Sequence, residues 1–325
     1  MRILRSVPIA AKAPIALTIG NFDGVHLGHQ AMLSRLGESA RDGGLPACAM
    51  TFEPHPREFF APDRAPSRLT SLREKLQLLA AYGIERSYVC RFNYLFAQIS
   101  PDEFIKRILV RGLGVHSLLV GDDFRFGARR AGDFSMLKQY ASQLGYTVDA
   151  MSSVMLEGER VSSTAVRKAL ECGDLAGAAR LLGRPYSIGG RVVRGDGLGR
   201  KLGYPTANVQ MKHNRPPLTG IFAVEVSGAA DSPLRGVASL GIRPTVKQHG
   251  EAVLEVYIFD FSGEIYGRHV RVDFLHKFRD EEKFKDLAEL TRQISVDVAN
   301  ARAYFRGSAA VPLDDKGGGV AQFRH

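Results

Sequence analysis

The sequence has few cysteines, no tryptophan and no long hydrophobic run, and each absence excludes a class of protein. The three cysteines, Cys48, Cys90 and Cys172, are far apart and odd in number, which excludes a CxxC metal site. We expect them to be reduced thiols in a cytoplasmic protein. No run approaches the roughly 20 apolar residues that span a bilayer, so we expect no integral membrane protein. The apolar run before Gly20 leads directly into a motif with chemical content, so we interpret it as a strand and not as a signal peptide.

The net charge of +10 favours anionic partners. The basic residues are spread along the chain and form no tract, which argues against nucleic acid. Some of them lie beside glycines, in RFGARR and GLGRK, where they suit phosphate binding. We therefore predict phosphorylated small molecules as partners, with no nucleic acid and no membrane.

The first half of the chain alternates between short apolar runs and helical periodicity. The predicted strands are 15–19, 46–52, 87–92 and 116–121, and the predicted helices are 26–40, 71–83 and 101–114. Strands separated by helices at this spacing indicate an α/β domain with a parallel, doubly wound sheet. Ligands bind at the carboxyl ends of the strands in such sheets.

The pattern changes near residue 184, where two helices ending at Gly173 and Gly183 give way to strict alternation. The predicted strands there are 186–193, 221–226, 234–241, 252–261 and 269–278. This pattern favours an antiparallel sheet or barrel, followed by a helix over 280–305 with acidic residues in its first turn. We predict one domain over 1–183, a second over 184–306, and a disordered tail over 307–325 that is rich in glycine and charge.

The segment TIGNFDGVHLGHQ combines a strand end, glycines and two histidines at the start of a helix. His26 and His29 are three residues apart and share a face, and a helix N-terminus offers free N–H groups to phosphate. The candidate phosphate-binding residues are Gly20, Phe22, Asp23, His26, Gly28 and His29. Two surface histidines after a tight turn are the ordinary alternative. A zinc pair is less favoured, because no third ligand follows at metalloprotease spacing.

Three further segments of this half carry polar groups that suit a nucleotide. In VSSTAVRKAL, Ser162, Ser163 or Thr164 caps a helix, and Arg167 lies one turn later as a forked phosphate donor. In TFEPHP, His55 stands between two prolines. The segment GDDFRFGARR combines acidic, aromatic and basic side chains that could stack on a planar ring and hold phosphate. They are Asp122, Asp123, Phe124 and Arg125. An ordinary capped helix and two polar loops are the alternatives.

The second half has its own cluster, RGDGLGRKLGYPTAN. The glycines allow backbone amides to approach phosphates, and two basic side chains supply charge. The candidate residues are Gly195, Gly197, Gly199, Arg200, Lys201, Tyr204, Pro205, Thr206 and Asn208. Thr206 and Asn208 share a face of an extended segment and suit Mg²⁺. Glu255, alone in an apolar strand, suits a general base, and an edge-strand glutamate facing water is the alternative.

The GxFDxxHxGH pattern resembles the nucleotidyltransferase superfamily. Over roughly residues 10–305 the chain resembles the bacterial bifunctional riboflavin kinase/FMN adenylyltransferase family. The shared segments are GNFDGVHLGHQ, TFEPHP, GDDFRFG, VSSTAVR, LLGRPYSIGG, GRKLGYPTAN, SLGIRPTV, LEVYIFDF and LTRQISVD. The resemblance implies a Rossmann-like nucleotidyltransferase domain with a parallel sheet, then an antiparallel riboflavin kinase-like β-barrel with a terminal helix.

The resemblance also implies two reactions. In the C-terminal domain the ribityl hydroxyl of riboflavin attacks the γ-phosphate of ATP, giving FMN, with Thr206 and Asn208 holding Mg²⁺ and Glu255 as base. Arg243, in SLGIRPTV, belongs to the ATP and flavin site of that domain. In the N-terminal domain FMN attacks the α-phosphate of ATP, giving FAD and pyrophosphate. The alternatives are an adenylyltransferase for another acceptor, such as nicotinamide mononucleotide, and a non-catalytic nucleic-acid or flavin-binding protein.

Overall fold

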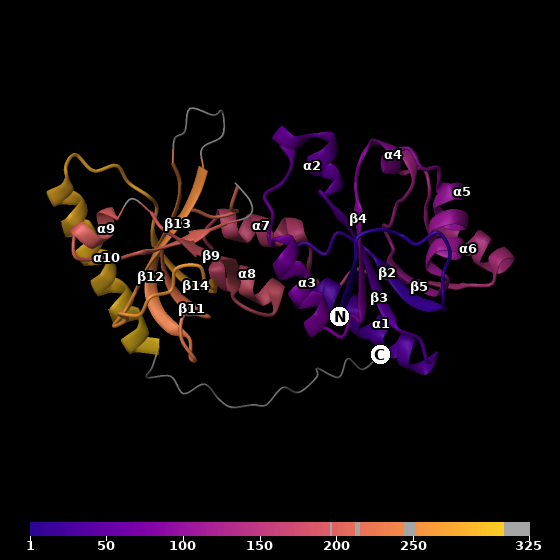
Figure 1. Ribbon diagram of the computed structural model, residues 1–325, viewed down its shortest axis with the longest axis horizontal. Helices are drawn as coiled ribbons and strands as arrows, with labels where there is room; N and C mark the ends of the chain where they lie inside the picture. Colours follow the sequence, from indigo (N-terminus) through magenta and orange to yellow (C-terminus); the bar gives the residue numbers. More distant parts are fainter. Residues whose placement is uncertain (196, 212–214, 244–250, 309–325) are drawn as a thin grey trace. The chain divides into compact units, whose positions relative to one another are not determined.

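The computed structural model describes every residue except 196, 212–214, 244–250 and 309–325. The chain forms two compact units (Figure 1). The first comprises Met1–Gly189 with the described residues 215–218, and the second comprises Gly190–Met211 with the described residues from Thr219 onward.

A six-stranded parallel sheet forms the centre of the first unit. Its strands are β1 (Arg2–Leu4), β2 (Ile15–Ile19), β3 (Ala47–Glu53), β4 (Arg86–Arg91), β5 (Val115–Gly121) and β6 (Thr147–Met151). Their order is β1-β4-β3-β2-β5-β6, so the direction of winding reverses between β2 and β5. Loops that leave the carboxyl ends of two strands at such a point diverge and leave a crevice for a ligand.

Helices cover both faces of this sheet (Figure 1). On one face pack α1 (Leu27–Asp42) and α3 (Leu72–Ala81), through residues such as Leu36 and Leu79. On the other pack the π-helix η2 (Phe104–Leu113) and α6 (Phe134–Leu144). The shorter helices are α2 (Pro56–Phe60), η1 (Pro62–Arg64), α4 (Tyr94–Ala97), α5 (Pro101–Glu103) and η3 (Ala128–Arg130). After a small hairpin of β7 (Met155–Leu156) and β8 (Glu159–Arg160) follow α7 (Ser163–Glu171) and α8 (Leu175–Leu182).

The four strands predicted for this half are present, and two edge strands were missed. β1 has three residues, and β6 is half-exposed along its length, so neither has the buried apolar run that identifies the central strands. The helix predicted over 101–114 is divided into the single turn α5 and the π-helix η2.

The second unit is a closed antiparallel barrel of six strands in the order β10-β13-β12-β11-β14-β9. The strands are β9 (Tyr186–Val193), β10 (Ala207–Gln210), β11 (Gly220–Ser227), β12 (Leu234–Arg243), β13 (Glu251–Ile258) and β14 (His269–Arg279). The short helix α9 (Leu198–Lys201) lies between β9 and β10. Leu254 and Val256 on β13 are buried inside the barrel, so the side chain of Glu255, which lies between them, points to the outer face.

The terminal helix α10 (Leu287–Ser308) packs on the outer face of the barrel through Ala301 and Phe305. It begins seven residues later than the prediction of 280–305, because Asp286 accepts a hydrogen bond from the backbone N–H of Glu289 at 2.8 Å and so caps the helix. The acidic residues before Asp286 precede the helix. Of the tail predicted to be disordered, 309–325 lies outside the described residues.

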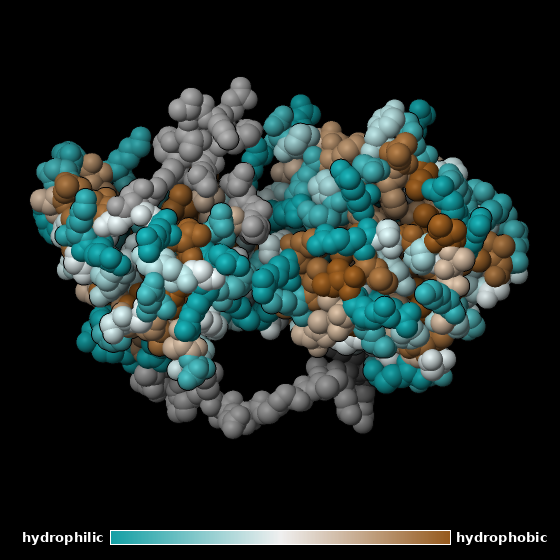
Figure 2. Space-filling model, viewed as in Figure 1, coloured by the Kyte–Doolittle hydropathy of each residue, from teal (hydrophilic) through white to brown (hydrophobic). Residues whose placement is uncertain are grey.

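No described helix is both long enough and apolar enough to cross a membrane. On the face drawn in Figure 2, hydrophilic residues predominate and hydrophobic residues form separate patches.

Candidate active sites

A cavity of about 1020 Å³ lies in the first unit, at the carboxyl ends of the strands on both sides of the β2–β5 reversal. Its wall comes from the loops after β2, β3 and β5 and from the start of α7. The predicted residues that line it are Gly20, Asp23, His26, Gly28, His29, His55, Asp122, Asp123, Phe124, Arg125, Ser162, Ser163, Thr164 and Arg167. Phe22 is fully buried beneath it. Segments that are up to 150 residues apart in sequence thus meet at the crevice that the topology predicts.

The two histidines of the first motif stack on each other at the N-terminus of α1. Their ring centroids are 3.7 Å apart with an interplanar angle of 19°. His26 is the N-cap, and its Nδ1 accepts from the backbone N–H of His29 at 3.4 Å. A Cβ at Gly28 would stand 3.2 Å from the His26 ring, so glycine allows this close packing. Stacked rings do not direct two nitrogens at one metal ion, and no group of three metal-ligating side chains occurs in the described part of the chain.

Burial keeps both imidazoles neutral. It lowers the pKa of His26 to about 4, although the nearby Asp23 carboxylate acts in the opposite direction. Burial first, then repulsion from His26 when that ring is protonated and from the charge of Lys75, hold the pKa of His29 well below its usual value. Among the described residues, the buried Nδ1 of His29 has no hydrogen-bond partner.

The lowered pKa of His26 predicts a pH-dependent stability. Between pH 6.5 and 4 the unfolded chain binds a proton at His26 that the folded chain does not. The contribution of His26 to the free energy of unfolding is therefore fully present above pH 6.5 and is lost as the pH falls toward 4. His26 alone contributes about 3 kcal/mol over this interval. Denaturant unfolding at a series of pH values measures it, and His26→Asn, which keeps a helix cap, is the control. Equal pH slopes for the two proteins would contradict the prediction.

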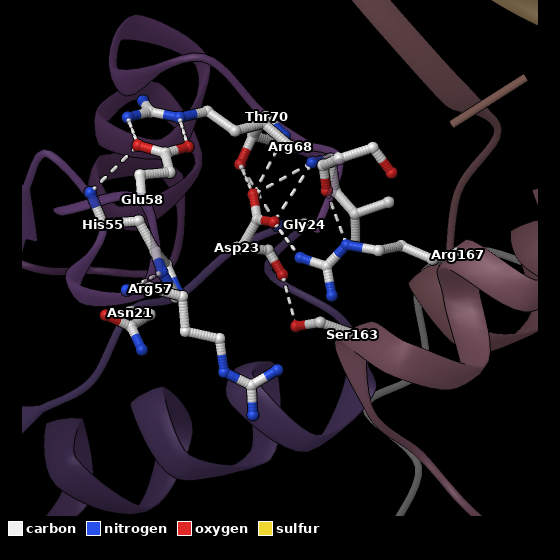
Figure 3. Close-up of polar contacts among 12 residues, drawn as sticks. Asn21, Asp23, Gly24, His55, Arg57, Glu58, Arg68, Thr70, Ser163 and Arg167 are labelled. Atoms are coloured by element: carbon white, nitrogen blue, oxygen red, sulfur yellow. Dashed lines mark hydrogen bonds and ion pairs between the residues drawn. The ribbon is translucent and has the colours of Figure 1, made fainter. Parts of the chain in front are cut away.

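Asp23 joins three segments of the site (Figure 3). Its carboxylate accepts from the backbone N–H groups of Leu69 and Thr70 at 3.0–3.1 Å, and it pairs with Arg167, whose Nε donates to the carbonyl of Ser67. Only 7% of the Asp23 side chain is exposed. In this structure Arg167 is therefore held by protein groups, and Asp23 fixes the loop between Gly20 and α1 to the start of α7.

The three hydroxyl residues at the start of α7 have different surroundings. The Oγ of Ser162 accepts from the backbone N–H of Ala165 at 3.1 Å and caps the helix. The Oγ of Ser163 donates to the carbonyl of Asp23 at 2.9 Å. Thr164 is exposed at the cavity wall. Of the three residues predicted as the possible helix cap, Ser162 is the one that caps α7.

The loop between Gly20 and α1 has a strained backbone. Phe22 and Val25 have φ values of 48° and 42°, which L-residues rarely adopt. Side chains from elsewhere bind its carbonyls: Gln30 donates to Val25 at 2.8 Å, and Arg184 donates to Gly24 at 2.6 Å. Strain of this kind persists only where surrounding contacts fix the loop, and it is typical of functional sites.

His55 is held as a neutral donor by a network that the sequence did not reveal. Its Nδ1 accepts from the backbone N–H of Arg57 at 3.1 Å, so the proton is on Nε2. Burial lowers the pKa of His55. Arg68 pairs with Glu53 at 2.7 Å and also with Glu58. Glu58 in turn accepts a hydrogen bond from the backbone N–H of His55 (Figure 3). This bridge fixes the turn that presents His55 to the cavity.

Lys75, on α3, was also missed, because it falls on a helix with ordinary amphipathic spacing. It is 4% exposed, and burial lowers its pKa against the opposing effect of Asp23. Its charge in turn lowers the pKa values of His29 and His55, in addition to burial. Buried lysines are rare. Only the three-dimensional fold brings this one beside the histidines.

The loop after β5 supplies an aromatic wall and several charges. Phe124 and Phe126 are stacked with centroids 5.7 Å apart. The aromatic residues that line the cavity are Phe52, Phe60, Phe92, Phe96, Phe104, Phe124 and Phe126. Asp123 pairs with Arg160 at 2.7 Å, and Arg125 pairs with Asp133 at 3.1 Å, while Asp122 is exposed. The predicted mixture of rings and charges is therefore present.

In the second unit, strand register brings the predicted base and metal-binding residues together. Glu255 on β13 lies directly opposite Asn208 on β10 and opposite Ser239 on β12, so these side chains share the outer face. The hydroxyl of Thr206 lies 3.5 Å from the Glu255 carboxylate. Because the barrel is closed, β13 pairs with β10 on one side and β12 on the other, so Glu255 does not lie on an edge strand.

The glycine-rich loop packs against these side chains. A Cβ at Gly195 would lie 2.3 Å from the Asn208 amide, and one at Gly199 would lie 3.1 Å from the Thr206 hydroxyl. Gly197 has φ 71°, in the left-handed region, and precedes α9, which carries Arg200 and Lys201. Tyr204 packs edge-on against Tyr257 at 5.5 Å, and Pro205 is exposed. Arg243 ends β12, and its side chain lies outside the described residues.

Comparisons with known proteins match both units. The family model for FAD synthetase matches residues 9–165, and that for riboflavin kinase matches 182–305. A bifunctional riboflavin kinase/FMN adenylyltransferase from Pseudomonas fluorescens is 50% identical over 292 residues, which cover 90% of this chain and 93% of that protein. The one from Escherichia coli (strain K12) is 46% identical over 308 residues, covering 94% and 98%. A crystal structure described as a macrolide-efflux protein from Streptococcus pneumoniae superposes with a TM-score of 0.79 and 29% identity, covering 93% of this chain and 99% of that one.

Proposed function

The chain belongs to the family of bifunctional riboflavin kinases/FMN adenylyltransferases, and on that premise we propose which of its residues perform the two reactions. The FAD synthetase domain is N-terminal and the riboflavin kinase domain is C-terminal. The predicted fold class and the two predicted activities are confirmed. The roles of individual residues are proposals.

We propose that the cavity of the first unit binds ATP and FMN for adenylyl transfer. The observation that carries this proposal is the convergence of two helix N-termini, those of α1 and α7, on one wall. The triphosphate lies against their free N–H groups, with His29 and Thr164 donating to its oxygens. A phosphate oxygen of FMN attacks the α-phosphorus and pyrophosphate leaves, so the protein supplies position and charge and no nucleophile.

The aromatic wall is the proposed position of the isoalloxazine ring. The edge-to-face and stacked phenylalanines present both flat faces and edges to a planar ligand, which stacks with such rings. Phe60 is 67% exposed, an unusual position for a large apolar side chain, and a bound ring would cover it.

For the kinase we propose Glu255 as the base that takes the proton of the ribityl hydroxyl. The hydroxyl of Thr206 and the amide oxygen of Asn208, gathered beside Glu255 by the two glycines, are hard oxygen donors that fit Mg²⁺. The ion would be held by these two side chains together with substrate phosphates, and would supply charge neutralisation on the transferred phosphoryl group.

The finer assignments also stay proposals. We propose the domain bounds 1–183 and 184–306, substrates confined to small molecules with no nucleic acid or membrane partner, and a cytoplasmic location. The cytoplasmic location is supported by the three scattered cysteines, none of which pairs in the described structure.

A product assay tests the proposal as a whole. We expect the purified protein with riboflavin, ATP and Mg²⁺ to form FMN and then FAD, both separable by chromatography. Neither product would contradict the proposal, and FMN without FAD would confine activity to the second unit. Nicotinamide mononucleotide in place of flavin is expected to give no adenylylated product, because the aromatic wall suits a larger planar ring.

A further inference from the structure

Six arginines line the adenylyltransferase cavity, and they divide into two groups. Arg125, Arg160 and Arg167 are each paired with an aspartate. For the guanidinium groups of Arg57, Arg129 and Arg130, the described part of the chain offers no ion-pair or hydrogen-bond partner. Figure 3 shows the guanidinium of Arg57 without a contact to the residues drawn. Three cations at the cavity thus stay available for an anionic ligand.

Two of these, Arg129 and Arg130, also have an unusual backbone. Their φ values are 55° and 57°, consecutive residues in the left-handed region that favours glycine. Such a conformation is costly for L-residues and persists only where the surrounding structure imposes it.

The surrounding structure does impose it here. Phe126 and Gly132 exchange two backbone hydrogen bonds of 3.1 and 2.9 Å, which close the loop between them. The N–H of Ala128 donates to the carbonyl of Ile99 at 2.7 Å, and a Cβ at Gly127 would lie 2.7 Å from Pro101. These contacts fix the backbone of the loop at both ends and at Ala128, so the main chain of the two arginines is set by the fold, while their side chains are exposed.

The reaction needs two anion sites in this cavity. The helix N-termini of α1 and α7 suit the triphosphate of ATP, whereas the arginine pair belongs to the same loop as Phe124 and Phe126 of the aromatic wall, with Gly127 and Ala128 between Phe126 and the pair. A flavin stacked on that wall would direct its ribityl chain and terminal phosphate to a different group of donors from those of ATP. The pair supplies two planar forks, each able to hold two phosphate oxygens.

We propose that Arg129 and Arg130 form the subsite for the terminal phosphate of the acceptor and select phosphorylated flavin over riboflavin. This rests on the proposed function of the cavity. A non-bridging oxygen of FMN forms the new bond to the α-phosphorus, and the bond from that phosphorus to the β-phosphate oxygen breaks, with its electron pair leaving on pyrophosphate. The arginines offset the repulsion between the phosphate dianion and the triphosphate as they approach. Riboflavin lacks the dianion and gains nothing from them.

The test compares R129G/R130G with the wild-type full-length protein in FAD formation from supplied FMN. Glycine removes the charges and also suits the positive φ, so the melting temperature should stay the same or rise. We expect the KM for FMN to rise at least about tenfold, since a charge-assisted hydrogen bond to phosphate is worth that much or more. The KM for ATP and the riboflavin kinase activity should change less than about twofold.

Two matched variants separate charge from strain. R129K/R130K keeps the charges without the forks and should give an intermediate KM for FMN. Glu157→Gly relaxes another positive φ, of 51°, outside the cavity wall, and should leave the KM for FMN unchanged. A raised KM for ATP with unchanged KM for FMN in R129G/R130G would overturn the proposal, as would unchanged values for both. Wild-type protein that forms no FAD would instead overturn the proposed function.

Discussion

Replacement of Glu255 by glutamine is expected to lower riboflavin phosphorylation by about 10² to 10⁴-fold, the usual contribution of a general base. The amide has nearly the same shape but cannot take the proton of the ribityl hydroxyl. Its neighbours Thr206 and Asn208 keep their places, because strand register and the packed glycines position them. Adenylylation of supplied FMN should be unchanged, since that cavity lies wholly in the other unit. The two products are measured separately by chromatography.

Glu225→Gln is the matched control, because Glu225 is a glutamate on β11 of the same barrel, opposite Arg235 and far along the sheet from Glu255. It should retain full kinase activity. Equal losses in the two variants would show that any glutamine in the barrel is harmful, and loss of both activities in Glu255→Gln would contradict independent sites.

The reciprocal result is expected from His29→Ala. FAD formation from FMN should fall by about 10² to 10³-fold, as when one preorganised donor to developing charge is removed. His29 is held neutral by burial, stacked on His26, and has an unpaired buried nitrogen at the cavity wall. Riboflavin phosphorylation measured in the same preparation should be unaffected.

His116→Ala serves as the control for that experiment. His116 is exposed near the amino end of β5, whereas the cavity lies at the carboxyl ends of the strands. FAD formation by this variant should equal that of the wild type. A His29→Ala protein that retains more than about a third of wild-type activity would exclude a direct role for the imidazole, because loss of one such donor typically costs far more.

Much of the architecture could be predicted because it depends on local patterns. The central strands β2, β3, β4 and β5 each have a buried middle section, which is almost wholly apolar in β2 and β3. Alternation in the second half identified five of the six barrel strands. β10 has only four residues and follows the glycine-rich loop, so its periodicity is too short to detect.

The arrangement within the site depends on contacts between distant residues, which sequence periodicity does not encode. Asp23 and Arg167 belong to two separate motifs, each predicted to bind phosphate, but the fold pairs them with each other across 144 positions. Lys75 acts on His29 and His55 from a helix with no motif. Arg68, which also belongs to no motif, fixes the turn at His55 through its ion pair with Glu58. Of these later findings, only Arg129 and Arg130 could be noticed in the sequence, as a basic run beside Gly127. Their positive φ values are visible only in the structure.

The hydrogen bond from Arg184 to the carbonyl of Gly24 bears on how this protein can be dissected. A fragment that ends at residue 183 would remove the side-chain donor that binds the strained loop between Gly20 and α1. It would also remove the backbone N–H of Gly189, which donates to Glu74 at the cap of α3. A fragment that ends at Gly189 keeps both. Arg184 and the first residues of β9 thus stabilise the loop and the helix cap beside the first candidate site, in addition to leading into the barrel.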